Sequence, residues 1–207
     1  MEKDLYLSGR KLPVLEEFYT LQGEGFNTGK AAYFLRIGGC DIGCTWCDSK
    51  LSWSGNTFPL TAVDEVIERA KQYPAKALVV TGGEPALFPL DYLCDRLHEE
   101  GFETYLETSG AYPLSGSWDW VCLSPKRQSP PYPDNYAKAH ELKVIIEQPA
   151  DMNWAEENAR QVNPGCHLFL QPEWSRRKEI ATVIVSYIGE HPEWRLSLQS
   201  HKYIGIP

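Results

Sequence analysis

Short apolar runs that predict strands alternate with amphipathic segments that predict helices along the 207-residue chain. Strands are predicted at residues 31–37, 77–81, 102–107, 120–123, 142–146, 167–170 and 194–198, and helices at residues 61–73, 90–100, 152–161 and 177–189. Thr61 is a candidate N-cap, with Asp64 three residues later, and Pro74 would end that helix. The proline-rich segment 124–135 predicts a loop.

This alternation favours a mostly parallel sheet with crossover helices, which places the chain in the α/β class. About seven strands with few helices are too little for a complete eightfold barrel, which takes ~250 residues. We therefore expect residues 1–207 to form one domain, a partial, open (β/α) barrel. Ligands of parallel sheets bind beyond the carboxyl ends of the strands, so the chemistry is expected there.

Composition and charge exclude several functional classes. Apolar residues make up 43% and charged residues 23%, which is typical of a globular chain. The formal charge is −8, and no long basic run occurs, so direct binding of nucleic acid is not expected. No run approaches the ~20 apolar residues of a membrane helix. Residues 1–4 are charged rather than apolar like a signal region, so we expect a cytoplasmic protein.

Three of the six cysteines form a tight group with the spacing C-x3-C-x2-C, at Cys40, Cys44 and Cys47. Thiolates are soft ligands that suit iron–sulfur clusters and zinc. Three cysteines leave one iron of a 4Fe–4S cluster open, as in a catalytic metal site. The alternatives are a zinc knuckle with a distant fourth ligand, or three unrelated buried cysteines. The other cysteines lie singly in predicted core elements and are expected to be buried: Cys94, Cys122 and Cys166.

The cysteine motif, with Trp46 before its last cysteine, resembles the signature of radical S-adenosylmethionine (SAM) enzymes. Residues 81–85 (Thr-Gly-Gly-Glu-Pro) follow a predicted strand and resemble the Gly-Gly-Glu-Pro motif of that family, which contacts the SAM amino group. A Gly-Gly turn alone is weak evidence, because any turn from a strand to a helix can contain one. The two motifs in this order together identify the chain as a member of the family.

Further segments are similar to the 7-carboxy-7-deazaguanine synthase family over nearly the whole chain. They are residues 17–25, 47–49, 107–110, 124–126, 141–144, 171–172 and 199–207. The resemblance implies a carbon–nitrogen lyase that converts 6-carboxy-5,6,7,8-tetrahydropterin to 7-carboxy-7-deazaguanine and releases ammonia. This ring contraction belongs to 7-deazapurine biosynthesis, such as the queuosine route of tRNA modification. The implied cofactors are a 4Fe–4S cluster, SAM and Mg²⁺.

The resemblance also implies roles for individual residues. The cluster ligands are the three grouped cysteines, Ser49 is the Mg²⁺ ligand, and no catalytic side chain is needed beyond the SAM-derived radical. The implied SAM contacts are Trp46, Cys47, Asp48, Gly83, Glu84, Ser124, Pro125, Lys126 and Gln171. The implied substrate contacts are Leu21, Gln22, Gly23, Glu24, Arg36, Thr81, His201 and Pro207, the last through its carboxylate.

Arg36 stands out in the sequence itself, as a charged residue in an otherwise apolar strand four residues before Cys40. Its planar fork suits the substrate carboxylate. The alternative is a surface arginine on an edge strand. Similarly, residues 22–25 are either a ligand-binding loop or an ordinary Gly-rich hairpin loop, and the last residues are either ordered over the substrate or a loose tail.

The implied partners are a small pterin substrate, an electron donor such as flavodoxin or ferredoxin, and a second copy of the chain in a homodimer. Two other functions compete with this one. A glycyl-radical activase has a similar length and cluster but acts on a protein, and a non-enzymatic zinc or electron-transfer module would leave Arg36 and residues 82–85 without a role.

Overall fold

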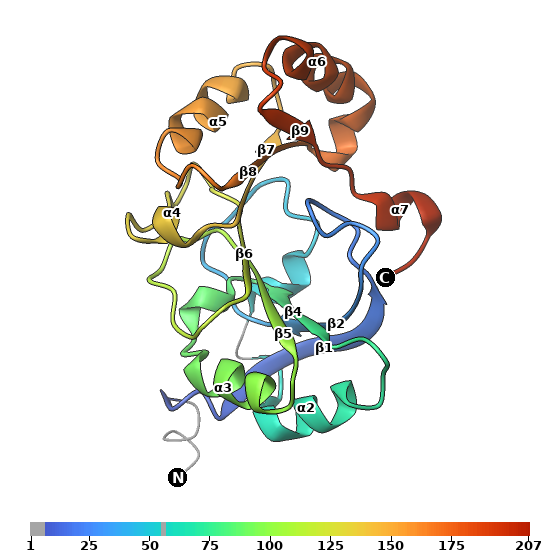
Figure 1. Cartoon of the computed structure of the whole chain (residues 1–207), viewed down its shortest axis with the longest axis vertical. Helices are drawn as coiled ribbons and strands as arrows, with labels where there is room; N and C mark the ends of the chain where they lie inside the picture. Colours follow the sequence, from blue (N-terminus) through green and yellow to red (C-terminus); the bar gives the residue numbers. More distant parts are fainter. Residues whose placement is uncertain (1–6, 55–56) are drawn as a thin grey trace.

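The computed structural model describes residues 7–54 and 57–207, so the N-terminal residues 1–4 discussed above lie outside the described part (Figure 1). The described strands form one nine-stranded sheet in the order β3-β1-β2-β4-β5-β6-β7-β8-β9. β1 pairs with β2 and with β3 antiparallel, whereas all pairs from β2 to β9 are parallel. Because β3 and β9 are edges and do not pair, the sheet is not closed. The predicted partial, open barrel is therefore confirmed.

The strands are β1 (Lys11–Leu21), β2 (Ala31–Ile37), β3 (Leu60–Ala62), β4 (Ala77–Gly82), β5 (Glu103–Thr108), β6 (Trp120–Leu123), β7 (Glu141–Ile146), β8 (His167–Pro172) and β9 (Trp194–Leu196). The α-helices are α2 (Val63–Ala70), α3 (Asp91–Glu99), α4 (Asn135–Lys138), α5 (Asp151–Ala159), α6 (Arg177–Glu190) and α7 (Ser200–Ile204). The short 3-10 helices within the described residues are η1 (Lys50–Trp53), η3 (Pro85–Leu87) and η4 (Trp174–Arg176).

The seven predicted strands are all present, but the helix predicted at residues 61–73 is wrong at both ends. Thr61 is not an N-cap, because it lies in β3 and pairs with Leu12 of β1. The helix begins at Val63 and ends at Ala70, several residues before Pro74. The sequence analysis also missed β1, β3, α4 and α7.

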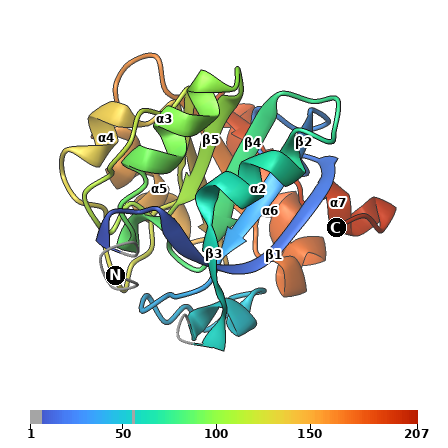
Figure 2. The same ribbon diagram turned by 90° about the horizontal axis from the view of Figure 1, so that it is seen from below.

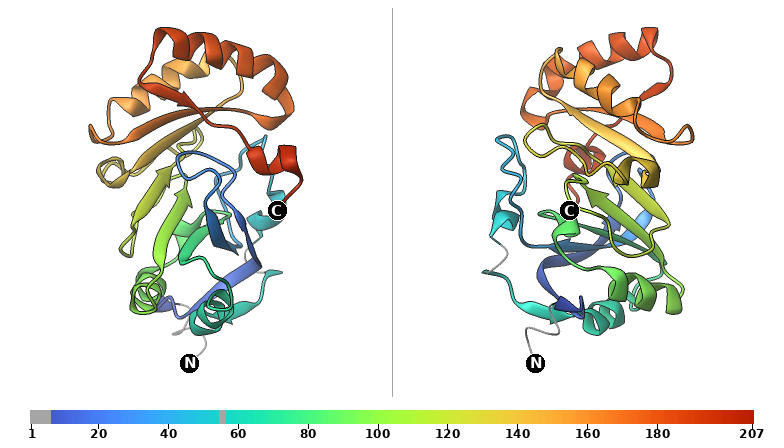
Figure 3. Two further views of the ribbon diagram at one scale, coloured as in Figure 1. Left: turned by 45° about the vertical axis from the view of Figure 1, so that its right-hand side comes forward. Right: turned by 90° about the vertical axis from the view of Figure 1, so that its left-hand side faces the viewer.

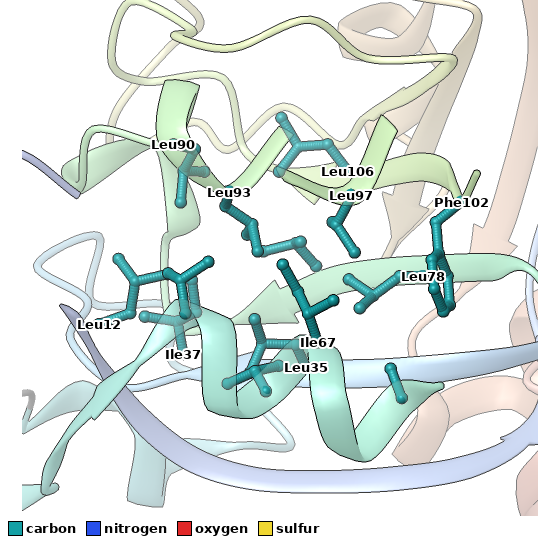
Figure 4. Packing of buried hydrophobic residues seen from close by; sticks show 14 of the residues in the cluster. Leu12, Leu35, Ile37, Ile67, Leu78, Leu90, Leu93, Leu97, Phe102 and Leu106 are labelled. Carbon is teal, nitrogen blue, oxygen red and sulfur yellow. The ribbon is translucent and has the colours of Figure 1, made fainter. Parts of the chain in front are cut away.

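Two apolar clusters lie between the sheet and its helices. In the first, α2 and α3 pack on β2, β4 and β5, as Figures 2 and 4 show, with Leu35, Leu78 and Leu106 at its centre. In the second, α5 and α6 cover β7 and β8, and Trp194 of β9 is 1% exposed. Among the described residues, no helix has the length and apolar character needed to cross a membrane.

The cysteines outside the motif follow this packing. Cys94 and Cys122 are fully buried, as predicted. Cys166 is only half-buried, at the edge of the second cluster, because it precedes β8 rather than lying inside it. The six cysteines are all free thiols.

Strand alternation directs a set of polar side chains to the sheet face opposite the helices. In β2, Leu35 and Ile37 belong to the first cluster while Phe34 packs on the opposite face. Because neighbouring side chains alternate between faces, the polar residues near the carboxyl ends of five strands share that opposite face. They are Arg36, Thr81, Glu107, Lys143 and Gln171.

Candidate active site

A cavity of about 580 Å³ opens at the carboxyl ends of the parallel strands. Of the 20 residues proposed for cofactor, metal or substrate contact, all except Pro125 line it. They are Leu21, Gln22, Gly23, Glu24, Arg36, Cys40, Cys44, Trp46, Cys47, Asp48, Ser49, Thr81, Gly83, Glu84, Ser124, Lys126, Gln171, His201 and Pro207. The fold thus brings these residues together, and their individual roles stay predictions.

The cysteine loop and the Gly-Gly turn after β4 are joined through their backbones. Gly83 N donates to the carbonyl of Ile37 at 2.8 Å, and Glu84 N donates to the carbonyl of Gly39 at 2.8 Å. A Cβ at Gly83 would lie 2.1 Å from the Gly39 carbonyl oxygen, which only glycine avoids. The two glycines therefore allow the turn to lie directly against the cysteine loop.

The three motif cysteines fit an iron–sulfur cluster by their chemistry. Ser49 N and Trp53 Nε1 both donate to Cys47 Sγ, at 3.4 Å each, which is the kind of contact that stabilises a ligating thiolate. Burial raises the pKa of Cys40 and Cys44, so their thiolates need a bound cation. Within the described residues no three His, Cys, Asp or Glu side chains are grouped around one point. A 4Fe–4S cluster does not require this, because each thiolate binds a different iron.

Glu84 is buried and orders the loop after β5. Its carboxylate accepts hydrogen bonds from Ala86 N at 3.0 Å, Ser109 N at 2.8 Å, and the hydroxyls of Thr108 and Ser109. The carboxylate therefore joins the turn after β4 to the turn after β5 at the cavity wall.

Lys126 is the only charged group of residues 124–126. Its Nζ donates to Ser124 Oγ at 2.7 Å and lies 5.6 Å from the centre of the Trp46 ring. Burial lowers the pKa of Lys126. Pro125 does not line the cavity, although both of its neighbours do, so a contact through its side chain is not indicated.

Gln22, Glu24, Glu107 and Lys143 form a closed circuit of hydrogen bonds that we call the polar ring. Lys143 Nζ donates to Glu24 Oε2 at 2.6 Å and to Glu107 Oε2 at 2.8 Å. Gln22 Nε2 donates to Glu107 Oε1 at 3.1 Å, and Gln22 Oε1 accepts from Glu24 N at 3.1 Å. Residues 22–25 are thus not an ordinary hairpin loop, because they are tied to β5 and β7.

Electrostatics hold the polar ring in a charged state. Burial alone would raise the pKa of Glu24, but the charge and hydrogen bond of Lys143, with Gln199, lower it to about 2. Burial also opposes the charge on Lys143, yet Cys122 and the carboxylates of Glu107 and Glu24 hold its pKa well above the ordinary value. At neutral pH the ring therefore contains an ionised Glu24 carboxylate and the Lys143 ammonium group.

Arg36 is not on an edge strand, because β2 lies between β1 and β4. Its side chain is 24% exposed, and its Nε donates to Glu16 Oε1 at 2.5 Å. It lies opposite Thr81 in the β2–β4 register and lines the cavity. The guanidinium therefore lies at the cavity wall, paired with Glu16, which also lines the cavity.

The C-terminal segment is ordered over the cavity, at the right of Figure 1, so the loose-tail interpretation is wrong. Gln199 Nε2 donates to Glu24 Oε1 at 2.9 Å and to Asp48 Oδ2 at 3.2 Å, and Lys202 Nζ donates to Asp48 Oδ2 at 2.6 Å. The ring of His201 lies so close to Gly23 that a Cβ there would be 2.1 Å from His201 Nδ1.

The sequence analysis missed nine polar residues at this cavity: Glu16, Lys50, Glu107, Thr108, Ser109, Lys143, Glu173, Gln199 and Lys202. Lys143 carries the signal that identified Arg36, a charged residue within the apolar strand Glu-Leu-Lys-Val-Ile-Ile. Glu107 is the last but one residue of β5, and its side chain lies on the same face of the sheet. Gln199 begins the family-like segment 199–207, but no local pattern marks it as a contact residue, since its contacts depend on the path of the chain after β9.

Comparisons with known proteins agree with this site. Residues 35–122 match the model of the radical SAM superfamily. The chain is 53% identical over 199 residues to the 7-carboxy-7-deazaguanine synthase of Flavobacterium psychrophilum, covering 96% of this chain and 94% of that protein. It is 46% identical over 194 residues to the synthase of Synechocystis, covering 94% and 93%. The crystal structure of QueE from Escherichia coli has a TM-score of 0.80 at 31% identity, covering 96% and 99%.

These relatives favour the synthase over the activase and over the non-enzymatic module. Membership of the radical SAM superfamily implies a 4Fe–4S cluster and SAM, which confirms those two cofactor predictions. With most of the chain aligned at up to 53% identity, and with the thiols, the Gly-Gly turn and the polar cavity in place, the chain belongs to the 7-carboxy-7-deazaguanine synthase family of radical SAM lyases.

Proposed function

We propose that this protein converts 6-carboxy-5,6,7,8-tetrahydropterin to 7-carboxy-7-deazaguanine with release of ammonia, on a route to 7-deazapurines such as queuosine. The observation that carries the proposal is that one cavity joins the three thiols, the Gly-Gly turn, Arg36 and the polar ring. Such a cavity offers a cofactor end and, beside it, groups for a polar heterocycle that carries a carboxylate.

The cofactor end consists of residues whose chemistry suits the cluster and SAM. Cys40, Cys44 and Cys47 would hold the cluster, with the N–H donors of Ser49 and Trp53 supporting the last of them. SAM would be held by the residues named for it above, of which only Pro125 lies off the cavity. When bound, the cluster and SAM together supply the radical that removes a hydrogen atom from the substrate.

The remaining side chains bind and orient the pterin. Arg36 would pair with its carboxylate, and this bidentate contact would compete with Glu16 for the guanidinium. The backbone and side chains of Gln22 and Glu24 would bind the ring edge, because they offer both donors and acceptors. Leu21, Gly23, Thr81, His201 and Pro207 complete the wall on which the ring would lie.

The proposal includes Mg²⁺ at Ser49. Mg²⁺ prefers oxygen ligands and keeps several waters. One protein hydroxyl, together with the substrate carboxylate and waters, is therefore a sufficient set of ligands. Members of this family commonly have threonine here, as the sequence resemblance implies, and serine keeps the oxygen. We expect Mg²⁺ binding to persist with serine.

The proposal also covers the assembly and the setting of the enzyme. A flavodoxin or ferredoxin would supply the electron, and two copies would form a homodimer. Six free thiols suit a reducing compartment such as the cytoplasm. Residues 1–207 would act as one domain, since the described strands form a single sheet and the loops after them line one cavity.

The test is an anaerobic assay of cluster-loaded protein with SAM, a reductant, Mg²⁺ and the carboxy-tetrahydropterin, followed by mass spectrometry. We expect the deazapurine and ammonia in equal amounts. Cys44→Ala should lose the iron chromophore and the product together, whereas Cys94→Ala, at a buried cysteine away from the cavity, should keep the chromophore. A fully loaded protein that forms no deazapurine would refute the proposed function.

A further inference from the structure

The polar ring contains two residues for which substrate contact is proposed, Gln22 and Glu24, and two for which it is not, Glu107 and Lys143. Two hydrogen bonds join these pairs, from Gln22 to Glu107 and from Lys143 to Glu24. The other two lie within a pair, from Lys143 to Glu107 and from Glu24 N to Gln22. Glu107 and Lys143 lie on β5 and β7, the rigid sheet, whereas Gln22 and Glu24 lie on a loop. The sheet residues are therefore placed to fix the loop residues.

Stability does not account for the ring. Lys143 is only 5% exposed, and burying an ammonium group between two carboxylates costs desolvation energy that a well-packed apolar core would not require. Its neighbours on β7 that face the helices, Leu142 and Val144, are fully buried apolar residues of the second cluster. A charged group kept at this depth indicates a role at the cavity.

We infer that Lys143 and Glu107 are positioning residues that hold the Glu24 carboxylate and the Gln22 amide in one orientation for the pterin ring. This inference rests on the proposed function and names groups that act through Gln22 and Glu24 without touching the substrate. Glu107 accepts from the Gln22 NH₂ group, which fixes which end of the amide faces which way.

Lys143 acts on Glu24 in two ways. Its hydrogen bond to Oε2, together with the Gln199 bond to Oε1, fixes the plane of the carboxylate. Its charge keeps that carboxylate ionised, and an ionised carboxylate only accepts hydrogen bonds. The Glu24 carboxylate therefore selects an edge of the pterin ring that presents adjacent N–H groups, such as an amide N–H beside an amino group.

The charged and titratable groups near Glu24 and Lys143 come from several elements. They are Glu107 on β5, Cys122 on β6, Glu141 on β7, His201 and Lys202 on α7, and Asp48 and Lys126 on loops. Lys143 is the only cation among them that forms an ion pair with Glu24. Removing its charge should therefore move protonation of Glu24 toward neutral pH.

The test uses cluster-loaded Lys143→Met. We expect kcat/KM for the pterin to fall about 100-fold, mainly through KM, while the dissociation constant for SAM changes by less than about twofold. We also expect kcat/KM of the variant to fall between pH 8 and pH 6, because Glu24 takes up a proton there. The wild type should show no such fall, and Lys143→Arg, which keeps the cation, should restore the flat profile.

Two further variants keep the test decisive if Lys143→Met folds poorly. Lys143→Met/Glu107→Gln removes one cation and one anion, so the buried net charge is unchanged, and it should still show the raised KM and the pH dependence. Lys71→Met, at a surface lysine just after α2 that does not line the cavity, is the matched control and should behave as wild type.

The outcomes separate this inference from the proposed function. Wild type that forms no deazapurine refutes the function. The positioning role is refuted if the wild type forms deazapurine and both proteins that carry Lys143→Met keep the wild-type KM and a flat pH profile. A loss of SAM affinity as large as the loss of pterin affinity would also refute it, since the ring would then act on the whole cavity.

Discussion

Glu141→Gln is expected to stabilise the protein at neutral and alkaline pH. Glu141 is buried, with only 2% of the residue exposed. Its carboxylate oxygen Oε2 accepts hydrogen bonds from Phe26 N at 3.0 Å and from Trp120 Nε1 at 3.3 Å. Burial raises its pKa from 4.5 to about 7, although the charge of Lys143 opposes the rise. A glutamine keeps one oxygen for both N–H donors and carries no charge.

The magnitude follows from the two pKa values. The folded state binds the Glu141 proton more tightly than the unfolded state, so wild-type stability is full below pH 4.5 and decreases as the pH rises toward 7. Each unit of difference corresponds to about 1.4 kcal/mol, so the loss is about 3 kcal/mol. The glutamine variant does not titrate and avoids this loss.

The assay is thermal unfolding of both proteins, loaded equally with cluster, at pH 5 and pH 8. For a chain of this length about 3 kcal/mol corresponds to a change in melting temperature of roughly 6–12 °C. The gain in melting temperature of the variant over the wild type should therefore be larger at pH 8 than at pH 5, by about that amount. Glu157→Gln, an exposed glutamate on α5, is the control and should show no such trend. Equal differences at the two pH values would refute the raised pKa.

Two glycine substitutions test the contacts around the cavity. Gly83→Ala would place a Cβ 2.1 Å from the Gly39 carbonyl, so we expect it to displace the cysteine loop and lower the iron content; full iron occupancy with unchanged SAM affinity would contradict this. Gly23→Ala would displace the His201 ring, 2.1 Å away, so the KM for the pterin should rise about tenfold with little change in melting temperature. Gly189→Ala on α6 meets no atom within 4 Å and should be neutral or slightly stabilising in both assays.

The strands were predictable where their side chains are apolar on both faces. β4 is an example, since Leu78 and Val80 join the first cluster while Ala77 and Val79 pack on the other face. β1 was not predictable in this way, because its second half, which contains Glu16 and Glu17, is only partly buried. Thr61 was misassigned for a related reason: its pairing with Leu12 depends on contacts 49 positions away in the chain.

The candidate site was predictable where a motif or a misplaced charge marked it. The cysteine loop and residues 81–85 are local patterns, and Arg36 is a charge inside an apolar strand. Lys143 met the same criterion and was overlooked, so the criterion is useful beyond one strand. The ion pair of Lys143 with Glu24 joins β7 to a loop 119 positions earlier in the chain. No local sequence pattern predicts a contact between residues so far apart.

The unpaired edges of the sheet have a consequence for how a ligand reaches the cavity. Between the β1–β2 loop and the segment after β9, contact is made by hydrogen bonds such as Gly25 N to Ser197 Oγ and Ser200 N to the Gly23 carbonyl, each 2.9 Å, rather than by a strand ladder (Figure 3). Such bonds contribute about 1 kcal/mol each, and neither apolar cluster crosses this seam. Local separation along it costs far less than global unfolding, so the side of the cavity can open to admit substrate while both cores stay packed.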